Sequence, residues 1–256
     1  AAEWFTAYHP FDDVIAWYKE LAAQHPQRVA QFISDVGTTH EGRKIVALKV
    51  TNVNSTTPAA EKQQIYIQGG IHAREWISHA TTQYITYNLV TSDEPRITSL
   101  LDTVEFLIVP IVNPDGYVHT WSSDRLWRKN RRDNGGGAYG VDLNRNWDAN
   151  WGHGGSSSFP HSDTYMGPSV ASEPETKALA ALFAAHPRIV AGLDMHSYSQ
   201  LILRPIGWDK RPAPHEKQHK AVTDQMAKII KKIHGKTYVS QKSIDLYPTT
   251  GSASDW

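Results

Sequence analysis

Hydrophobic positions recur along the chain with two different spacings. In residues 11–24, apolar side chains are three and four positions apart, which is typical of a helix with one buried face. The segments 43–50, 63–68 and 104–112 are instead short apolar runs that predict strands. The last two runs are apolar enough to predict central strands of a sheet.

The second half of the chain continues this alternation. Residues 172–185 predict a helix with Ser172 as its N-cap, Pro174 in its first turn and Glu175 at the capping-box position. Residues 188–197 indicate another buried strand. A further helical stripe consists of Val222, Met226, Ile229, Ile230 and Ile233. We expect these stripes to pack into a core, and strands that alternate with helices predict one α/β domain with helices on both faces of its sheet.

Composition narrows the choice of partners and metal ligands. The 256 residues are enough for one large domain. Acidic and basic side chains are equal in number, 26 of each, which favours neither nucleic acid nor an anionic membrane as a partner. No apolar run is long enough to span a bilayer. Because the sequence contains no cysteine, any zinc site must use His, Asp and Glu side chains.

Polar side chains follow the predicted strands at the points where these strands end. The stretch "GGIHAREWIS" brings His72 and Glu75 just after residues 63–68, and His196 closes the strand predicted last. Ligands of open α/β sheets bind outside the carboxyl ends of strands, so these positions favour one cleft. A catalytic zinc ion takes about three protein ligands, which makes these three residues candidates. An HxxE spacing is a weak signal alone, and a surface or hydrogen-bonded His72 is the alternative.

Two further segments carry arginines in a setting that favours anion binding. "LWRKNRR" contains Arg128 and Arg131, and "VDLNRNWD" contains Asn144 and Arg145. A guanidinium binds a carboxylate through a bidentate fork, and a buried guanidinium polarises a carbonyl oxygen. The alternative for a basic run is a solvated surface, which we expect for Arg132.

Six segments resemble the signature segments of zinc metallocarboxypeptidases of the pancreatic carboxypeptidase A/B type (peptidase family M14). They are "GGIHAREWIS", "NPDGY", "LWRKNR", "VDLNRNWD", "DMHSYSQLIL" and "GSASDW", in the family's order and over nearly the whole chain. The resemblance implies one α/β catalytic domain over residues 1–256. Its mixed, mostly central sheet would be of the eight-stranded type and flanked by helices on both faces.

The same resemblance implies a zinc-dependent exopeptidase, a hydrolase of the EC 3.4.17 type. Such an enzyme hydrolyses the C-terminal peptide bond of peptides and proteins by a zinc-activated water. His72, Glu75 and His196 would bind one Zn2+ per chain. Arg131 would polarise the scissile carbonyl and stabilise the oxyanion.

Substrate recognition is also implied by the resemblance. Asn144 and Arg145 would grip the terminal carboxylate of the substrate, with Tyr247 closing over it. Neighbouring subsites would be lined by Arg74, Arg128, Ser197 and Tyr198. Where family members carry an apolar or an acidic residue at the base of the specificity pocket, this chain has Ser254. A neutral residue there favours an apolar or broad side-chain preference.

The family's mechanism also needs a glutamate, on a strand shortly beyond "SASDW", that takes a proton from the water. This sequence has no counterpart of that glutamate. We therefore expect a C-terminal strand and helix to be missing from the chain, either as a noncovalently held fragment of the same protein or as a tail outside the sequence. A truncated product is the third explanation and would be an inactive zinc-containing binder of peptide C-termini. An enzyme acting on non-peptide amides is a further alternative that keeps the zinc.

The expected setting of the protein follows mainly from the resemblance. It predicts a secreted, extracellular protein, with the glycosylation sequon "NST" at Asn54 as minor support. We expect a monomer whose partners are peptide or protein C-termini, with neither nucleic acid nor membrane among them.

Overall fold

The apolar runs of the first half of the chain lie in the middle of a mixed sheet. The computed structural model describes residues 3–256, and within them five strands pair in the order β1-β2-β4-β3-β5. These strands are β1 (Val29–Thr38), β2 (Lys44–Val50), β3 (Gln63–Gly69), β4 (Val104–Val109) and β5 (Ile189–Met195). β3, β4 and β5 run parallel, whereas β1 and β2 are antiparallel to their neighbours. The prediction that the runs 63–68 and 104–112 form central strands is confirmed.

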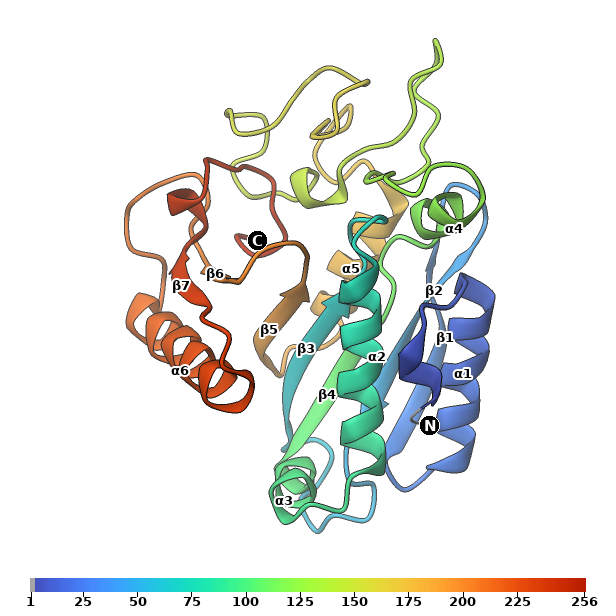
Figure 1. Ribbon diagram of the computed structural model, residues 1–256, viewed down its shortest axis with the longest axis vertical. Coiled ribbons are helices and arrows are strands. Elements are labelled where there is room, and N and C mark those ends of the chain that lie inside the picture. The colour runs from blue at the N-terminus through green and yellow to red at the C-terminus, as the bar shows by residue number, and fades with distance from the viewer. Residues whose placement is uncertain (1–2) are drawn as a thin grey trace. The chain divides into compact units, whose positions relative to one another are not determined.

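Helices cover both faces of this sheet. They are α1 (Phe11–Gln24), α2 (Trp76–Thr91), α3 (Pro95–Thr103), α4 (Pro114–Ser122) and α5 (Pro174–Ala184), and the 3-10 helix η1 (Glu3–Thr6) precedes α1. Ile67 of β3 belongs to the hydrophobic core that α1 and α2 cover, in front of the sheet in Figure 1. Tyr66 points to the opposite face because side chains alternate along a strand. Its ring centroid lies 4.5 Å from that of Phe183 in α5, so the predicted two-sided helical cover is confirmed.

The described chain divides into two compact units. Unit 1 comprises residues up to 132 together with 173–197 and contains the five-stranded sheet, and unit 2 comprises residues 133–172 and 198–256. Unit 2 has a separate parallel pair of strands, against which its long helix packs. Its elements are η2 (Leu143–Arg145), β6 (Leu201–Arg204), α6 (Glu216–His234), β7 (Val239–Lys242) and η3 (Ser243–Asp245).

Three details of the predicted fold are wrong. The described residues form a five-stranded and a two-stranded sheet rather than one sheet of the eight-stranded type. The strand predicted at 188–197 is not buried, because β5 is at an edge of its sheet and Val190 is 59% exposed. The helix predicted from Ser172 has Glu173 at its N-cap position instead, and the Ser172 hydroxyl accepts a hydrogen bond of 3.0 Å from the Asn146 amide.

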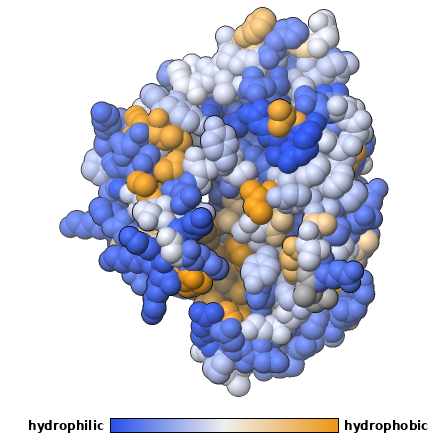
Figure 2. Space-filling model, viewed as in Figure 1, coloured by the Kyte–Doolittle hydropathy of each residue, from blue (hydrophilic) through white to orange (hydrophobic). Residues whose placement is uncertain are grey.

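The apolar stripe of α6 is less buried than expected. Val222, Ile229 and Ile233 are exposed, because β6 and β7 have four residues each and cover little of a helix of 19 residues. Elsewhere, the face of the molecule in Figure 2 is mainly hydrophilic, with hydrophobic residues in small groups. Among the described helices, none is both long and apolar enough to cross a bilayer.

Candidate metal centre and substrate-binding groups

The parallel strands β3 and β5 bring three candidate metal ligands together. The carboxyl ends of neighbouring parallel strands lie on the same side of the sheet, and here Gly69 of β3 pairs with Met195 of β5. His72 and Glu75 follow the end of β3, and His196 comes directly after β5. One ligand atom from each of the three side chains lies within 4.8 Å of the other two. Residues that are far apart in the sequence therefore offer a shared coordination site.

Glu75 connects the two histidines of this triad. Its Oε1 lies 2.9 Å from Nδ1 of His72, and its Oε2 lies 3.1 Å from Nδ1 of His196. The backbone N–H of Ser197 donates a hydrogen bond of 2.9 Å to the same Oε2. The side chains of His72 and Glu75 are buried, whereas that of His196 is one-third exposed. The triad is thus fixed on one side and reachable by solvent on the other.

The electrostatics of the triad favour a bound cation. Burial alone would raise the pKa of Glu75, but hydrogen bonds with His196 and His72 hold it well below its usual range. Burial would lower the pKa of His196, whereas the charge of Asp194 and hydrogen bonds with Asp194 and Glu75 raise it to about 10. A divalent metal ion replaces such a proton when it binds. Two imidazole nitrogens and one carboxylate are a donor set found in catalytic zinc sites, so the residues fit zinc.

The turn that carries His72 is held rigidly. The backbone N–H of Asn113 donates to the carbonyl of Gly70 at 3.1 Å, and its side-chain amide donates to the carbonyls of Ile71 and Lys129. Gly70 has a φ of 68°, and a Cβ at this position would lie 2.3 Å from Nε2 of His79. The tight turn therefore requires glycine, which explains the second glycine of "GGIHAREWIS".

The two arginines of "LWRKNRR" that the sequence singled out have different surroundings. Nη1 of Arg128 lies 3.7 Å from Oε1 of Glu75, beside the metal-ligand triad. Nε of Arg131 lies 3.5 Å from Oε1 of Glu41, and its guanidinium carbon lies 4.8 Å from the centroid of the Trp127 ring. The sequence prediction gave the carbonyl-polarising role to Arg131, but Arg128 is the arginine in ion-pair range of a triad member.

The residues predicted to bind a terminal carboxylate lie in unit 2. Oδ1 of Asn144 accepts a hydrogen bond of 2.9 Å from the N–H of Ala253. Arg145 is 3% exposed, and its Nη1 donates to the carbonyl of Asn144 and lies 4.0 Å from Oδ2 of Asp142. Its Nε is buried and has no hydrogen-bond partner within residues 3–256. A buried guanidinium N–H without an acceptor is a position that suits an anionic ligand.

The other predicted substrate residues differ in exposure. In unit 1, Nη1 of Arg74 donates to a main-chain carbonyl at 3.1 Å. In unit 2, Tyr198 is 95% exposed and Tyr247 is 51% exposed. The hydroxyl of Ser254 lies 3.5 Å from that of Ser252. The two tyrosines have room to change rotamer when a ligand binds, whereas Arg74 is already tied to the backbone.

Asp194 is a functional candidate that the sequence analysis missed. Its Oδ2 lies 3.0 Å from Nε2 of His196, so it fixes the orientation of that ring while Nδ1 faces Glu75. A carboxylate in this position orients a metal-binding histidine and raises its basicity. The signal was present in "DMH", because residues two apart on a strand lie on the same face.

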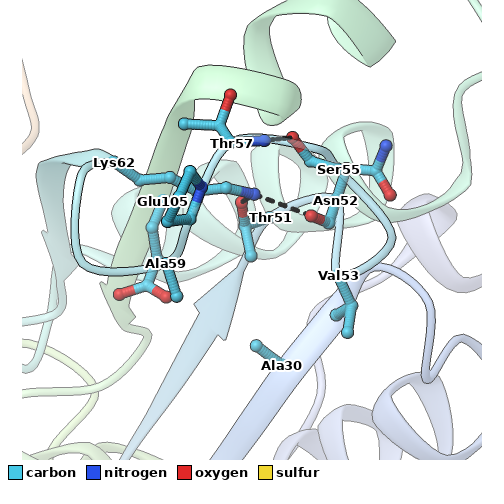
Figure 3. Close-up of a pocket in the computed structure, with 10 residues that line it drawn as sticks. Ala30, Thr51, Asn52, Val53, Ser55, Thr57, Ala59, Lys62 and Glu105 are labelled. Atoms are coloured by element: carbon cyan, nitrogen blue, oxygen red, sulfur yellow. Dashed lines mark hydrogen bonds between the residues drawn. The ribbon is translucent and has the colours of Figure 1, made fainter.

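A small pocket in unit 1 is lined by residues that belong neither to the metal-ligand triad nor to the predicted substrate-binding groups. It has a volume of about 210 Å³ and includes Lys62, Thr51 and Asn52 (Figure 3). Nζ of Lys62 donates to Oγ1 of Thr51 at 2.9 Å, to the carbonyl of Asn52 at 2.7 Å and to that of Leu101 at 3.3 Å. An ammonium group has three donors. Protein oxygens already satisfy them, so the pocket does not indicate a ligand.

The chain belongs to the zinc carboxypeptidase family. Residues 14–256 match the family model described as Peptidase M14, zinc carboxypeptidase, which confirms the resemblance found in the sequence. Zinc carboxypeptidase A 1 of Anopheles gambiae is 37% identical over 251 residues, which are 97% of this chain and 56% of the relative.

Solved structures are similar over the same length. A crystal structure of thrombin activatable fibrinolysis inhibitor gives a TM-score of 0.93 at 32% identity, covering 100% of this chain and 64% of the other. Carboxypeptidase A from Helicoverpa armigera gives 0.90 at 35% identity, covering 98% and 61%. This chain therefore spans about three-fifths of the length of these three proteins.

Proposed function

We propose that this protein is a zinc-dependent carboxypeptidase that removes residues from the C-termini of peptides and proteins. The observation that carries the proposal is the meeting of two imidazoles and one carboxylate where β3 and β5 end, in a chain of the zinc carboxypeptidase family. His72, Glu75 and His196 would hold one Zn2+. A bound zinc ion acts as a Lewis acid on the scissile carbonyl and lowers the pKa of water toward about 7.

Arg128 takes the role of polarising the scissile carbonyl in this proposal, in place of Arg131. The position of its Nη1, 3.7 Å from a carboxylate oxygen of Glu75, supports this choice. A positive charge beside the metal ligands stabilises the negative charge that develops on the carbonyl oxygen in the transition state. Arg131 is engaged with Glu41 and the Trp127 ring, so we assign it to holding this loop in place.

Recognition of a free C-terminus is assigned to Asn144 and Arg145. An exopeptidase must distinguish a terminal carboxylate from an internal amide, and a guanidinium does so by a charge-assisted hydrogen bond. The Nε of Arg145, which has no hydrogen-bond partner among the described residues, supports this role. Tyr247 would close over the bound residue, and Ser254 at the pocket base would admit apolar or varied side chains. Arg74, Ser197 and Tyr198 would line the neighbouring subsites.

The proposed setting is extracellular. Asn54, in the sequon "NST", is exposed and therefore accessible to glycosylation. We propose a secreted monomer that acts on peptide and protein C-termini.

The test uses the full-length protein, including the segment expected to supply the glutamate, and N-blocked dipeptides that end in Phe, Leu, Lys or Arg, each as the free acid and as the C-terminal amide. We expect hydrolysis of the free acids alone, loss of activity with a chelator, and recovery on addition of Zn2+. His72→Ala should lose the zinc of the His72, Glu75 and His196 triad together with the activity, whereas His234→Ala, at an exposed position of α6, should keep both.

Each other outcome identifies a different protein. Zinc-dependent binding of the free acids without product would show a binder of peptide C-termini. Equal hydrolysis of the amides would show an amide hydrolase without C-terminal recognition. Folded protein that binds no zinc would contradict the proposal altogether.

A further inference from the structure

A second cluster of metal-ligating side chains lies in unit 1 and has no part in the proposed reaction. His40 lies in the loop between β1 and β2, Glu173 is the residue before α5, and Glu175 lies in the first turn of α5. One ligand atom of each side chain lies within 4.8 Å of the other two. The ligand atoms of both clusters, this one and the triad of His72, Glu75 and His196, thus lie within 4.8 Å of one another.

Within the described residues, the contacts inside this cluster give a hydrogen-bond partner to every carboxylate oxygen but one. Nε2 of His40 lies 2.8 Å from Oε2 of Glu173. The amide of Asn130 donates to the same oxygen at 2.7 Å and to Oε2 of Glu175 at 3.1 Å, and Nη1 of Arg132 lies 3.3 Å from Oε1 of Glu173. Oε1 of Glu175 is buried and has no hydrogen-bond partner in the described part of the chain.

A buried carboxylate whose oxygen lacks a hydrogen-bond partner lowers the stability of the folded protein. Glu173 and Glu175 are both 0% exposed, and burial raises the pKa of Glu175 to about 7 because its charge loses hydration. A buried polar atom without a partner costs free energy that a suitable ligand would recover. The vacant acceptor is therefore an independent indication, beyond the clustering itself, that a cation belongs here.

The cluster is also held in place before any ion binds. The residues on either side of His40 are anchored to the buried carboxylate of Asp115, by the Thr39 hydroxyl at 2.7 Å and by the N–H of Glu41 at 2.8 Å. Asn130 orients both glutamates through one amide group. The His40 side chain is 28% exposed, which gives an ion access from solvent. Arg132 balances part of the negative charge through Glu173, while Oε1 of Glu175 has no partner among residues 3–256.

We propose that His40, Glu173 and Glu175 form a second metal site, which binds a divalent transition-metal ion such as Zn2+ through one imidazole nitrogen and two carboxylates. Imidazole with carboxylate ligands suits zinc and its first-row neighbours, and three protein ligands leave room for water. The bound ion ties the loop between β1 and β2 to the start of α5. Its role is structural, because none of the three residues belongs to the proposed catalytic machinery.

The test counts metal ions rather than turnover. Metal-free protein is titrated with Zn2+ alone, and the bound metal is measured after gel filtration. We expect two equivalents in the unchanged chain, one in His40→Phe, one in His72→Ala and none in the double variant. His234→Phe, an exposed histidine on α6, is the matched control and should keep two. Co2+ should reproduce these counts and give a separate visible absorption band for each site.

A second measurement keeps the proposal testable if one variant folds poorly. In the His72→Ala background, Zn2+ in large excess over Kd should raise Tm by about 5 °C. Adding His40→Phe, or Glu175→Gln with its nearly unchanged shape, should abolish that rise. A single equivalent of zinc that only His72→Ala removes would overturn the proposal, and so would a second equivalent that survives His40→Phe. In either case the cluster would be an ion-pair network alone.

Discussion

The two histidine–carboxylate clusters of unit 1 use the same side chains but treat a buried carboxylate in opposite ways. At the triad, both oxygens of Glu75 face an imidazole, and its pKa lies well below the usual range despite burial. At the second cluster, one oxygen of Glu175 has no partner among residues 3–256, and burial raises the pKa to about 7. Hydrogen bonds with two imidazoles thus lower the pKa of Glu75 against the effect of burial, whereas burial is the largest influence on the pKa of Glu175.

The helix ends do not explain this difference. Glu75 is the residue before α2, and Glu175 lies in the first turn of α5, so both lie where a helix dipole favours negative charge. An effect common to both positions cannot lower one pKa and raise the other. The comparison teaches that specific donors outweigh the helix terminus at these buried sites.

Each cluster also has an arginine beside it, and removing the arginine at the triad gives the largest expected effect. Arg128 lies 3.7 Å from Glu75, and Arg132 lies 3.3 Å from Glu173. We expect Arg128→Ala to lower kcat by about 10²- to 10³-fold, as for the loss of one oxyanion-stabilising donor. Arg132→Ala should leave kcat nearly unchanged, because its partner is not a catalytic group. Steady-state kinetics on the free-acid dipeptides measures both.

Arg131→Ala is the variant that decides between the two assignments of the polarising arginine. The sequence favoured Arg131, whereas the structure places Arg128 beside Glu75. If Arg131→Ala loses as much kcat as Arg128→Ala, at full zinc content, the assignment made from geometry fails.

Apolar periodicity found the elements whose buried faces are apolar. The helix predicted at 11–24 is α1 with the same bounds, and the runs at 63–68 and 104–112 contain the central strands β3 and β4. All buried side chains of α1 are hydrophobic, and β3 and β4 bury apolar runs together with Gln64, Gln68 and Glu105, so the apolar spacing was enough to indicate each element. The family resemblance, rather than spacing, selected His72, Glu75 and His196 from thirteen histidines and many acids.

Apolar periodicity could not find α2, because most of its buried side chains are polar. Ser78, His79, Thr82 and Thr86 are all buried in it. The hydroxyls of Thr82 and Thr86 donate to the carbonyls four residues earlier, at 2.9 and 2.8 Å, which satisfies them without neighbours. A helix that buries polar groups in this way has no apolar stripe to detect.

The second cluster was equally invisible in the sequence. His40 and Glu173 are 133 positions apart and lie in a loop and at a helix start, so no periodicity relates them. The choice between Arg128 and Arg131 had the same limit, because residues three apart in an irregular segment have no fixed relative direction. Only the folded backbone shows which one reaches Glu75.

The second largest expected effect, after that of Arg128→Ala, is a dependence of the metal-free protein's stability on pH, caused by Glu175. Its pKa is about 7 in the folded state and about 4.3 in an unfolded chain. Because the folded state holds the proton more tightly, this contribution to stability is fully present below the unfolded pKa and is lost as pH rises through about 7. The expected loss is about 3 kcal/mol between pH 4 and pH 8.

Glu175→Gln tests this sign directly. Glutamine cannot ionise, so the variant should not show the loss of stability that Glu175 causes between pH 4 and pH 8. Urea unfolding of chelator-treated protein over this pH range measures the stability. Glu20→Gln, at an exposed position of α1, is the control and should retain it. If the stability of the wild type changed between pH 4 and pH 8 by the same amount as that of the variant, Glu175 would be ionised over this whole range, like Glu75. The contrast between the two clusters would then disappear.

Of the effects expected for Arg128, Glu175 and Asp194, that of Asp194→Asn should be the smallest. Asp194 orients the ring of His196, and within residues 3–256 no carboxylate beyond the cluster orients the ring of His40 in the same way. Oδ2 of Asp194 lies 3.0 Å from Nε2 of His196, the ring nitrogen that faces away from Glu75. Asparagine keeps the shape but removes the charge, so zinc affinity at the triad should fall by about 10- to 100-fold. Competition with a chelator of known affinity measures this, with Asp13→Asn on the exposed side of α1 as the control. The count of zinc at the His40 cluster should not change. If the zinc affinity of Asp194→Asn equalled that of the control, the two imidazoles and Glu75 would keep their positions without Asp194. The triad would then differ from the second cluster only in its hydrogen bonds to Glu75.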